Sequence, residues 1–139
     1  MKPVAFLVFG QDWDSERFKQ LVVSLGGVAE AHSWDAVLTR DDATVWITVT
    51  PPLEPGQQSR NVGAYEEVLG AAPRHKVSLQ LSSRGDSEWL AAEIVMAAAD
   101  VWKLVVEGFD GEVVTDDEFA KRVAKRKRDL FRSRQLRPG

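Results

Sequence analysis

Cysteine is entirely absent from the 139-residue chain, which excludes disulfides, thiolate zinc ligands and cysteine nucleophiles together. Histidine is nearly absent: His32 and His75 lie far apart in sequence and form no short-spaced metal motif. No apolar run approaches the roughly 18 residues that a membrane-spanning helix requires. We therefore expect a cytoplasmic protein with no metal site, no cofactor and no membrane contact.

The remaining composition is that of an ordinary globular domain. Hydrophobic residues make up 44% and charged residues 28% of the chain, which is enough apolar material for one core. We expect a single domain over residues 1–132, followed by a frayed basic tail at 133–139. Valine far outnumbers isoleucine and arginine outnumbers lysine, a bias that suggests a GC-rich bacterial genome.

Charge is divided unevenly along the chain. Residues 116–139 carry nine basic and four acidic side chains, a net charge of +5, within a total of −3, so residues 1–115 carry −8. An acidic body with a basic end indicates either a surface that meets a charged partner or an end segment that folds back onto an acidic face.

Apolar periodicity predicts the element order β-α-β-β-α-β-α-β-β-α. The segment 4–9 is continuously apolar, and Gly10 follows without a signal-peptide cleavage site, so we expect a strand buried on both faces. Phe18, Leu21, Val22 and Leu25 form one helical stripe, which Gly26 ends. Alternation predicts strands at 36–39, 43–50 and 76–81.

The remaining elements follow from helical spacing and turn signals. A helix is predicted over 65–71 and a longer one from residue 86 or 87 to about 102, with a buried stripe of Leu90, Ile94, Ala97, Ala98 and Val101. An Asp-Gly turn at 110–111 predicts a hairpin of strands 103–107 and 112–114. A capping box at 115–118 starts a last helix that carries Phe119, Val123, Leu130 and Phe131.

These elements predict an α+β fold with a mixed, largely antiparallel sheet and helices packed mainly on one face. Between two of the strands, residues 51–60 form a long proline-rich segment. Its length makes it a candidate functional loop, and a solvated connector is the alternative.

Common catalytic patterns are missing. A phosphate loop needs closely spaced glycines, but Gly10 is followed by Asp12 and Asp14, whose carboxylates would repel phosphate. The acidic pairs at 41–42 and 116–117 fit a turn and a helix start. We therefore expect no catalytic residue and a protein that is not an enzyme; a small hydrolase that uses carboxylates or His75 is the alternative.

Tryptophan is abundant, with five residues, and three of them lie near acidic loops. Exposed tryptophan side chains with acidic residues around them often contribute strongly to the binding of basic partners. The alternative is that these indoles belong to the core. Trp89 and Trp102 are assigned to packing. The predicted partner-binding residues are Trp13, Trp34, Asp35, Asp41, Asp42 and Trp46.

The last predicted helix is strongly basic. Lys121, Lys125 and Arg128 share one helical face with Arg132, which would suit nucleic-acid phosphates. The acidic body and the lack of a basic aromatic sheet argue against that partner. Binding to nucleic acid stays an alternative, through Lys121, Arg122, Lys125, Arg126 and Arg128.

One segment resembles a known group of proteins. The alanine-rich stretch from Trp89 to Trp102, followed by KLVVEGFDGEVV at 103–114 and a capped helix, is similar to small bacterial immunity proteins of polymorphic toxin systems. It departs from them at Lys103, where a glycine pair often lies. The resemblance implies a cytosolic, non-catalytic inhibitor that binds and blocks a cognate toxin, and an acidic body would suit a basic toxin domain.

Overall fold

Seven strands and four helices are present in the residues that the structure, a computed structural model, describes: 3–30, 34–50, 62–71, 73–83, 86–125 and 130–131. The strands are β1 (Val4–Phe9), β2 (Val28–Ala29), β3 (Ala36–Arg40), β4 (Ala43–Val49), β5 (His75–Leu81), β6 (Leu104–Glu107) and β7 (Val113–Thr115). The helices are α1 (Ser15–Ser24), α2 (Val62–Leu69), α3 (Ser87–Ala99) and α4 (Asp116–Ala124).

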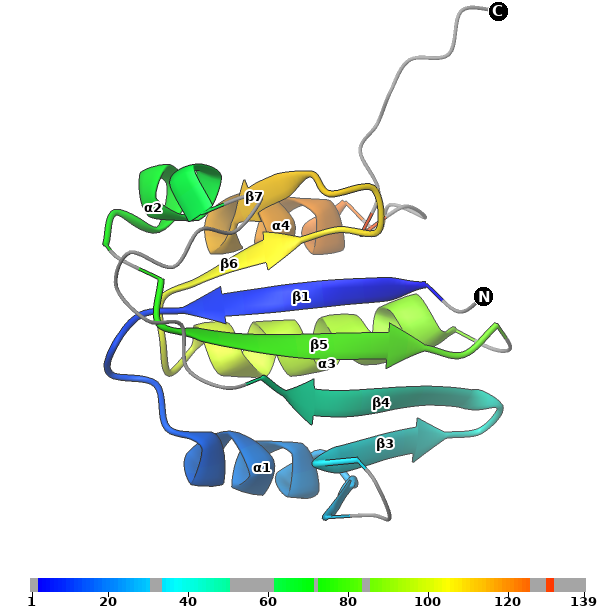
Figure 1. Ribbon diagram of the computed structural model, residues 1–139. Coiled ribbons are helices and arrows are strands. Elements are labelled where there is room, and N and C mark those ends of the chain that lie inside the picture. Colours follow the sequence, from blue (N-terminus) through cyan, green and yellow to red (C-terminus); the bar gives the residue numbers. More distant parts are fainter. Residues whose placement is uncertain are drawn as a thin grey trace, which may run out of the picture.

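The strands form one sheet in the order β2-β3-β4-β5-β1-β6-β7 (Figure 1). Every neighbouring pair is antiparallel. The predicted α+β fold is thus confirmed, although the described sheet contains no parallel pair of the kind that a mixed sheet would have. Strand β2 was not predicted, because two residues are too few to show an alternating pattern.

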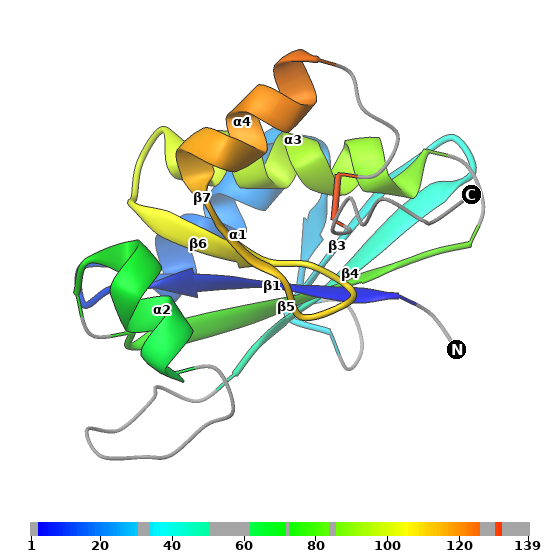
Figure 2. The same ribbon diagram turned by 90° about the horizontal axis from the view of Figure 1, so that it is seen from above.

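The helices lie on both faces of the sheet, but unequally. Helices α1, α3 and α4 cover one face and share the main core with it, whereas α2 lies on the opposite face (Figure 2). The expectation that helices pack mainly on one face is confirmed. Among the described residues, no helix is both long and apolar enough to cross a bilayer.

Strand β1 lies between β5 and β6. Its continuous apolar run predicted burial on both faces, and this is true of only part of the strand. Leu7, Val8 and Phe9 are fully buried, whereas Phe6 is half-buried. Leu7 and Phe9 face the main core, and Val8 packs with α2. Because α2 covers only one end of the strand, burial on both faces is limited to that end.

Helix α1 follows its predicted pattern. Asp14 is the N-cap, and its carboxylate accepts a hydrogen bond from the backbone N–H of Glu16. Phe18 and Val22 are buried in the core, and Leu21 and Leu25 pack against it. Gly26, with φ +106°, provides the left-handed backbone that ends the helix.

Helix α3 is buried over a wider arc than one stripe. Leu90, Ile94 and Ala98 are buried as predicted, but Ala91, Ala92 and Val95 are buried too. The prediction was wrong for Ala97, which is half-buried, and for Val101, which is 44% exposed. Helix α3 contacts α1, α4 and the sheet, so neighbours cover several of its sides, and it ends before Val101.

The last helix is shorter than predicted. The Oγ1 of Thr115 accepts from the N–H of Glu118 at 2.9 Å, which confirms the threonine cap, but α4 ends at Ala124. Leu130 and Phe131 are buried as expected, although they lie outside the helix. The ring of Phe131 lies 5.5 Å from that of Phe109 and 5.0 Å from that of Phe119.

The docked pair Leu130–Phe131 is held by backbone contacts as well as by its rings. The N–H of Phe109 donates to the carbonyl of Phe131 at 2.7 Å, and a guanidinium nitrogen of Arg122 donates to the carbonyl of Leu130 at 3.2 Å. A Cβ on Gly108 would lie 2.2 Å from the Phe131 carbonyl oxygen, so only glycine fits there.

Several predicted features lie outside the described residues. They are the candidate loop 51–60, His32, Arg126, Arg128 and the tail 133–139.

We expect Phe131→Ala to lower the free energy of unfolding by about 3 kcal/mol or more, because it removes a fully buried ring from a packed aromatic cluster. Urea denaturation followed by circular dichroism measures this loss. Val101→Ala is the control; its side chain is 44% exposed, so a change within about 0.5 kcal/mol is expected. Equal effects of the two substitutions would contradict the docking of residues 130–131.

Candidate functional site

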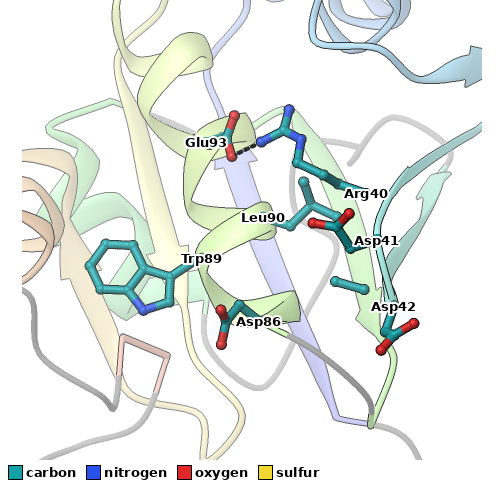
Figure 3. A pocket seen from close by; sticks show the side chains of 8 residues that line it. Arg40, Asp41, Asp42, Asp86, Trp89, Leu90 and Glu93 are labelled. Carbon is teal, nitrogen blue, oxygen red and sulfur yellow. Dashed lines mark hydrogen bonds and ion pairs between the residues drawn. The ribbon is translucent and has the colours of Figure 1, made fainter.

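A pocket of about 300 Å³ opens between the β3–β4 turn and the first half of α3 (Figure 3). Its volume is at the lower end of the range of ligand sites, about 300–1,000 Å³. The residues that line it are Arg40, Asp41, Asp42, Ala43, Asp86, Trp89, Leu90 and Glu93.

The turn brings two of the predicted partner-binding residues to this pocket. Arg40 pairs with Ala43 across the hairpin, which leaves Asp41 and Asp42 as a two-residue turn. Asp41 has φ +54°, in the left-handed region that aspartate tolerates better than most residues. Both aspartates are exposed, as the sequence predicted.

The floor of the pocket is apolar and its rim is charged. Leu90 and Ala43 are buried at 3% and 4% exposure, and Leu90 lies between α3 and the turn in Figure 3. Four acidic side chains and one arginine line the pocket, a net charge of −3.

Arg40 compensates the charge at one end only. Its guanidinium donates to the carboxylate of Glu93 and, at 3.2 Å, to the carbonyl of Leu25 at the end of α1. Within the described ranges, the carboxylates of Asp41, Asp42 and Asp86 have no hydrogen-bond or ion-pair partner. Asp86 is the N-cap of α3, yet its side chain makes no capping hydrogen bond. Of these three carboxylates, those of Asp42 and Asp86 lie at the end away from Glu93, and that of Asp41 lies beside Leu90 (Figure 3).

The other predicted partner-binding residues lie elsewhere. The rings of Trp34 and Trp46 are 6.1 Å apart and both residues are half-buried. Trp46 alternates with the buried Val45 and Ile47, so it faces away from the main core. One carboxylate oxygen of Asp35 accepts from the N–H of Val49 at 2.6 Å, so Asp35 has a structural role. The six predicted residues therefore do not form one surface.

The prediction that Trp13 is exposed was wrong. Trp13 was predicted as an exposed binding residue, but it is 5% exposed and belongs to the main core. Its ring centroid lies 5.1 Å from that of Phe9, 5.6 Å from Phe18 and 6.3 Å from Trp102. Only a short connection separates β1 from α1, and this places the indole beneath the first turn of the helix. The alternative that this indole belongs to the core is correct.

Six pocket residues were not predicted as site residues: the apolar Ala43 and Leu90, and four larger polar or aromatic side chains. Asp86 was assigned to a helix start and Trp89 to packing, and neither Arg40 nor Glu93 was considered as a site residue. Trp89 does pack against the core, and its indole points away from the turn in Figure 3. The signal available was that Asp86 and Glu93 are seven residues apart, on one side of a helix.

The carboxylates do not converge on one point. In Figure 3, the side chains of Asp42 and Asp86 point to one end of the pocket, and that of Glu93 to the other. Among the side chains that the structure describes, no group of three or more histidine, aspartate or glutamate residues could hold a metal ion. The arrangement suits an elongated cationic group better than a compact ion.

The basic residues proposed for nucleic acid are only partly described. Lys121 and Lys125 are exposed, but the side chain of Arg122 is 11% exposed. Its guanidinium donates to Glu112 at 2.8 Å and to the carbonyl of Leu130, so Arg122 is a structural residue. Helix α4 ends at Ala124, so of the predicted basic face only Lys121 lies within the helix and Lys125 is its C-cap, whereas Arg128 and Arg132 are outside the described residues.

The chain matches no known protein-family model, and no curated protein or solved structure is significantly similar to it.

His75, the candidate base of the hydrolase alternative, lies beside the aromatic cluster. Its ring is 5.1 Å from Trp13. Burial, and then the nearby positive charge of Arg74, lower the pKa of His75 below its ordinary value of 6.5. The neutral imidazole is therefore favoured in the folded chain.

This shift makes stability depend on pH. As pH falls through about 6.5, the unfolded chain takes up a proton at this position before the folded chain does, so stability falls. We expect the loss of melting temperature between about pH 8 and about pH 5 to be smaller for His75→Gln than for the unaltered chain. Differential scanning fluorimetry measures both curves, and identical pH dependence would contradict this role.

Proposed function

We propose that this protein is a non-catalytic binding module, an immunity- or antitoxin-like inhibitor that binds and blocks a basic bacterial toxin domain in the cytoplasm. The observation that supports this proposal is the pocket at the β3–β4 turn, which three carboxylates without partners in the described chain line together with the buried Leu90 and Ala43.

Such a pocket is chemically suited to a lysine or arginine side chain from a partner. The long aliphatic stems of these residues favour apolar contact while their charged heads favour carboxylates. Leu90 and Ala43 offer the apolar contact, and Asp41, Asp42 and Asp86 offer the negative charge. The head group would take the end of the pocket away from Glu93, whose charge Arg40 already compensates.

The net charge of residues 1–115 also favours a basic partner. Residues 1–115 carry a net charge of −8. A field of this sign accelerates the approach of a basic partner and disfavours nucleic acid. The resemblance to immunity proteins concerns the segment that forms α3, β6, β7 and the start of α4, and the pocket lies at the beginning of that segment.

The hydrolase alternative has less support. It requires two carboxyl groups that converge on one bond, whereas Asp42 and Asp86 come from opposite sides of the pocket and Glu93, which points to the other end, is paired with Arg40 (Figure 3). His75 packs against Trp13, which is in the core, rather than lining the pocket.

Isothermal titration against the product of the neighbouring gene tests the proposal, together with rescue of growth when the two proteins are co-expressed. We expect binding, and we expect the combined substitutions Asp41→Asn, Asp42→Asn and Asp86→Asn to weaken it about tenfold or more. Asparagine keeps the side-chain shape and tolerates the left-handed backbone at position 41.

The matched control changes three exposed acidic residues elsewhere: Glu66→Gln, Glu67→Gln and Asp100→Asn. Both triple variants alter the net charge by the same amount, so a general charge effect would weaken binding equally in both. Absence of binding together with absence of growth rescue would refute the inhibitor function. Binding that survives the pocket substitutions would instead move the interface away from the pocket.

A further inference from the structure

Helix α2 is attached to the sheet by a small cluster that is separate from the main core. Tyr65 and Leu69 pack on Val8 of β1 and Val105 of β6, and these four residues form their own buried group. The other three helices share the large cluster on the opposite face. Undocking α2 would therefore disturb few of the contacts that hold the rest of the fold.

The helix has little stability of its own. It is eight residues long, has Gly63 in its first turn, and carries neither an acidic residue in that turn nor a basic one in its last turn. Isolated helices of this length are not stable in water, and glycine disfavours them further. Helix α2 therefore depends on its contacts with the sheet for its helical structure.

One buried polar contact connects this helix to the sheet. The hydroxyl of Tyr65, 1% exposed, donates to the carboxylate of Glu107 on β6, itself 9% exposed. The ammonium of Lys76 on β5 donates to the same hydroxyl oxygen at 3.1 Å and lies 4.3 Å from the ring centroid of Phe6. Lys76 and Glu107 both belong to the sheet, and Tyr65 connects them to α2.

We infer that α2 is a cover that opens as a local unit, independently of global unfolding, and that the Tyr65–Glu107 hydrogen bond sets how often it opens. Elements with few buried contacts open at a lower free energy than the core they cover. Opening uncovers Val8 and Val105, which are fully buried in the closed state, beside the half-buried Phe6.

The absence of native cysteine allows a direct test. Val105→Cys places a thiol beneath α2, and Val77→Cys places one in the main core; both valines have 0% exposure. A thiol reagent labels each buried site only when it opens. We expect Cys at position 105 to react at least tenfold faster than Cys at position 77. Equal rates would overturn the inference, because α2 would then open only with the whole chain.

The role of Tyr65 is tested in the same background. Tyr65→Phe removes the hydroxyl and keeps the ring, and we expect it to raise labelling at position 105 by roughly tenfold, the effect of one hydrogen bond to a charged group. Ser87→Ala is the matched control. It removes a hydroxyl that donates to the carbonyl of Ser82 at 2.7 Å, at the start of α3 on the face of the sheet opposite α2. An equal effect of both substitutions on position 105 would overturn the role of Tyr65.

Hydrogen exchange of the chain without introduced cysteines provides an independent measurement. In the inferred opening, amides of α2 exchange faster than those of α3 and β6, and Tyr65→Phe accelerates α2 alone. Equal protection of α2 and α3 would overturn the inference, and exchange of β6 together with α2 would show that the sheet edge opens rather than the helix.

Discussion

Burial of β1 is the constraint on which the rest of the structure depends. This strand pairs with β5 on one side and with β6 on the other, so it joins the two halves of the sheet. On one of its faces, Leu7 and Phe9 are buried in the main core that three helices share. On the other face, Val8 is buried against α2. Water is excluded from both faces only because α2 lies over this end. The division into a large and a small core follows from that strand.

The two faces of the sheet have different consequences for function. On the face covered by three helices, α3 packs against α1, α4 and the sheet, and its first half forms a pocket with the β3–β4 turn. Arg40 fixes this arrangement, because its guanidinium connects Glu93 of α3 to the carbonyl that ends α1. On the other face a single short helix is attached through Tyr65 and Leu69. The acidic pocket and the helix α2 with its small core thus lie on opposite sides of one sheet.

Local patterns predicted most of the fold. The alternation in β4, the stripe of α1, the threonine cap of α4 and the Asp-Gly turn all express short-range preferences, and each is present in the structure. The errors occurred where distant contacts decide. Val101 was predicted as buried because helical spacing continues past Ala99, and the end of α4 was extended because Phe131 fits the same spacing. Phe131 lies outside α4, and its ring packs on that of Phe109, which is far away in sequence.

The sequence by itself determined the fold class, most element positions, the acidic body and the exposure of Asp41 and Asp42, because these depend on composition and on neighbours along the chain. Only the tertiary structure decided which acidic residues share a site. It placed Asp86 and Glu93 opposite the turn and buried Trp13 in the core. The physical reason is that a pocket is formed by elements that meet in space, and the packing of α3 on the sheet is set by the shape of the whole core rather than by any local pattern.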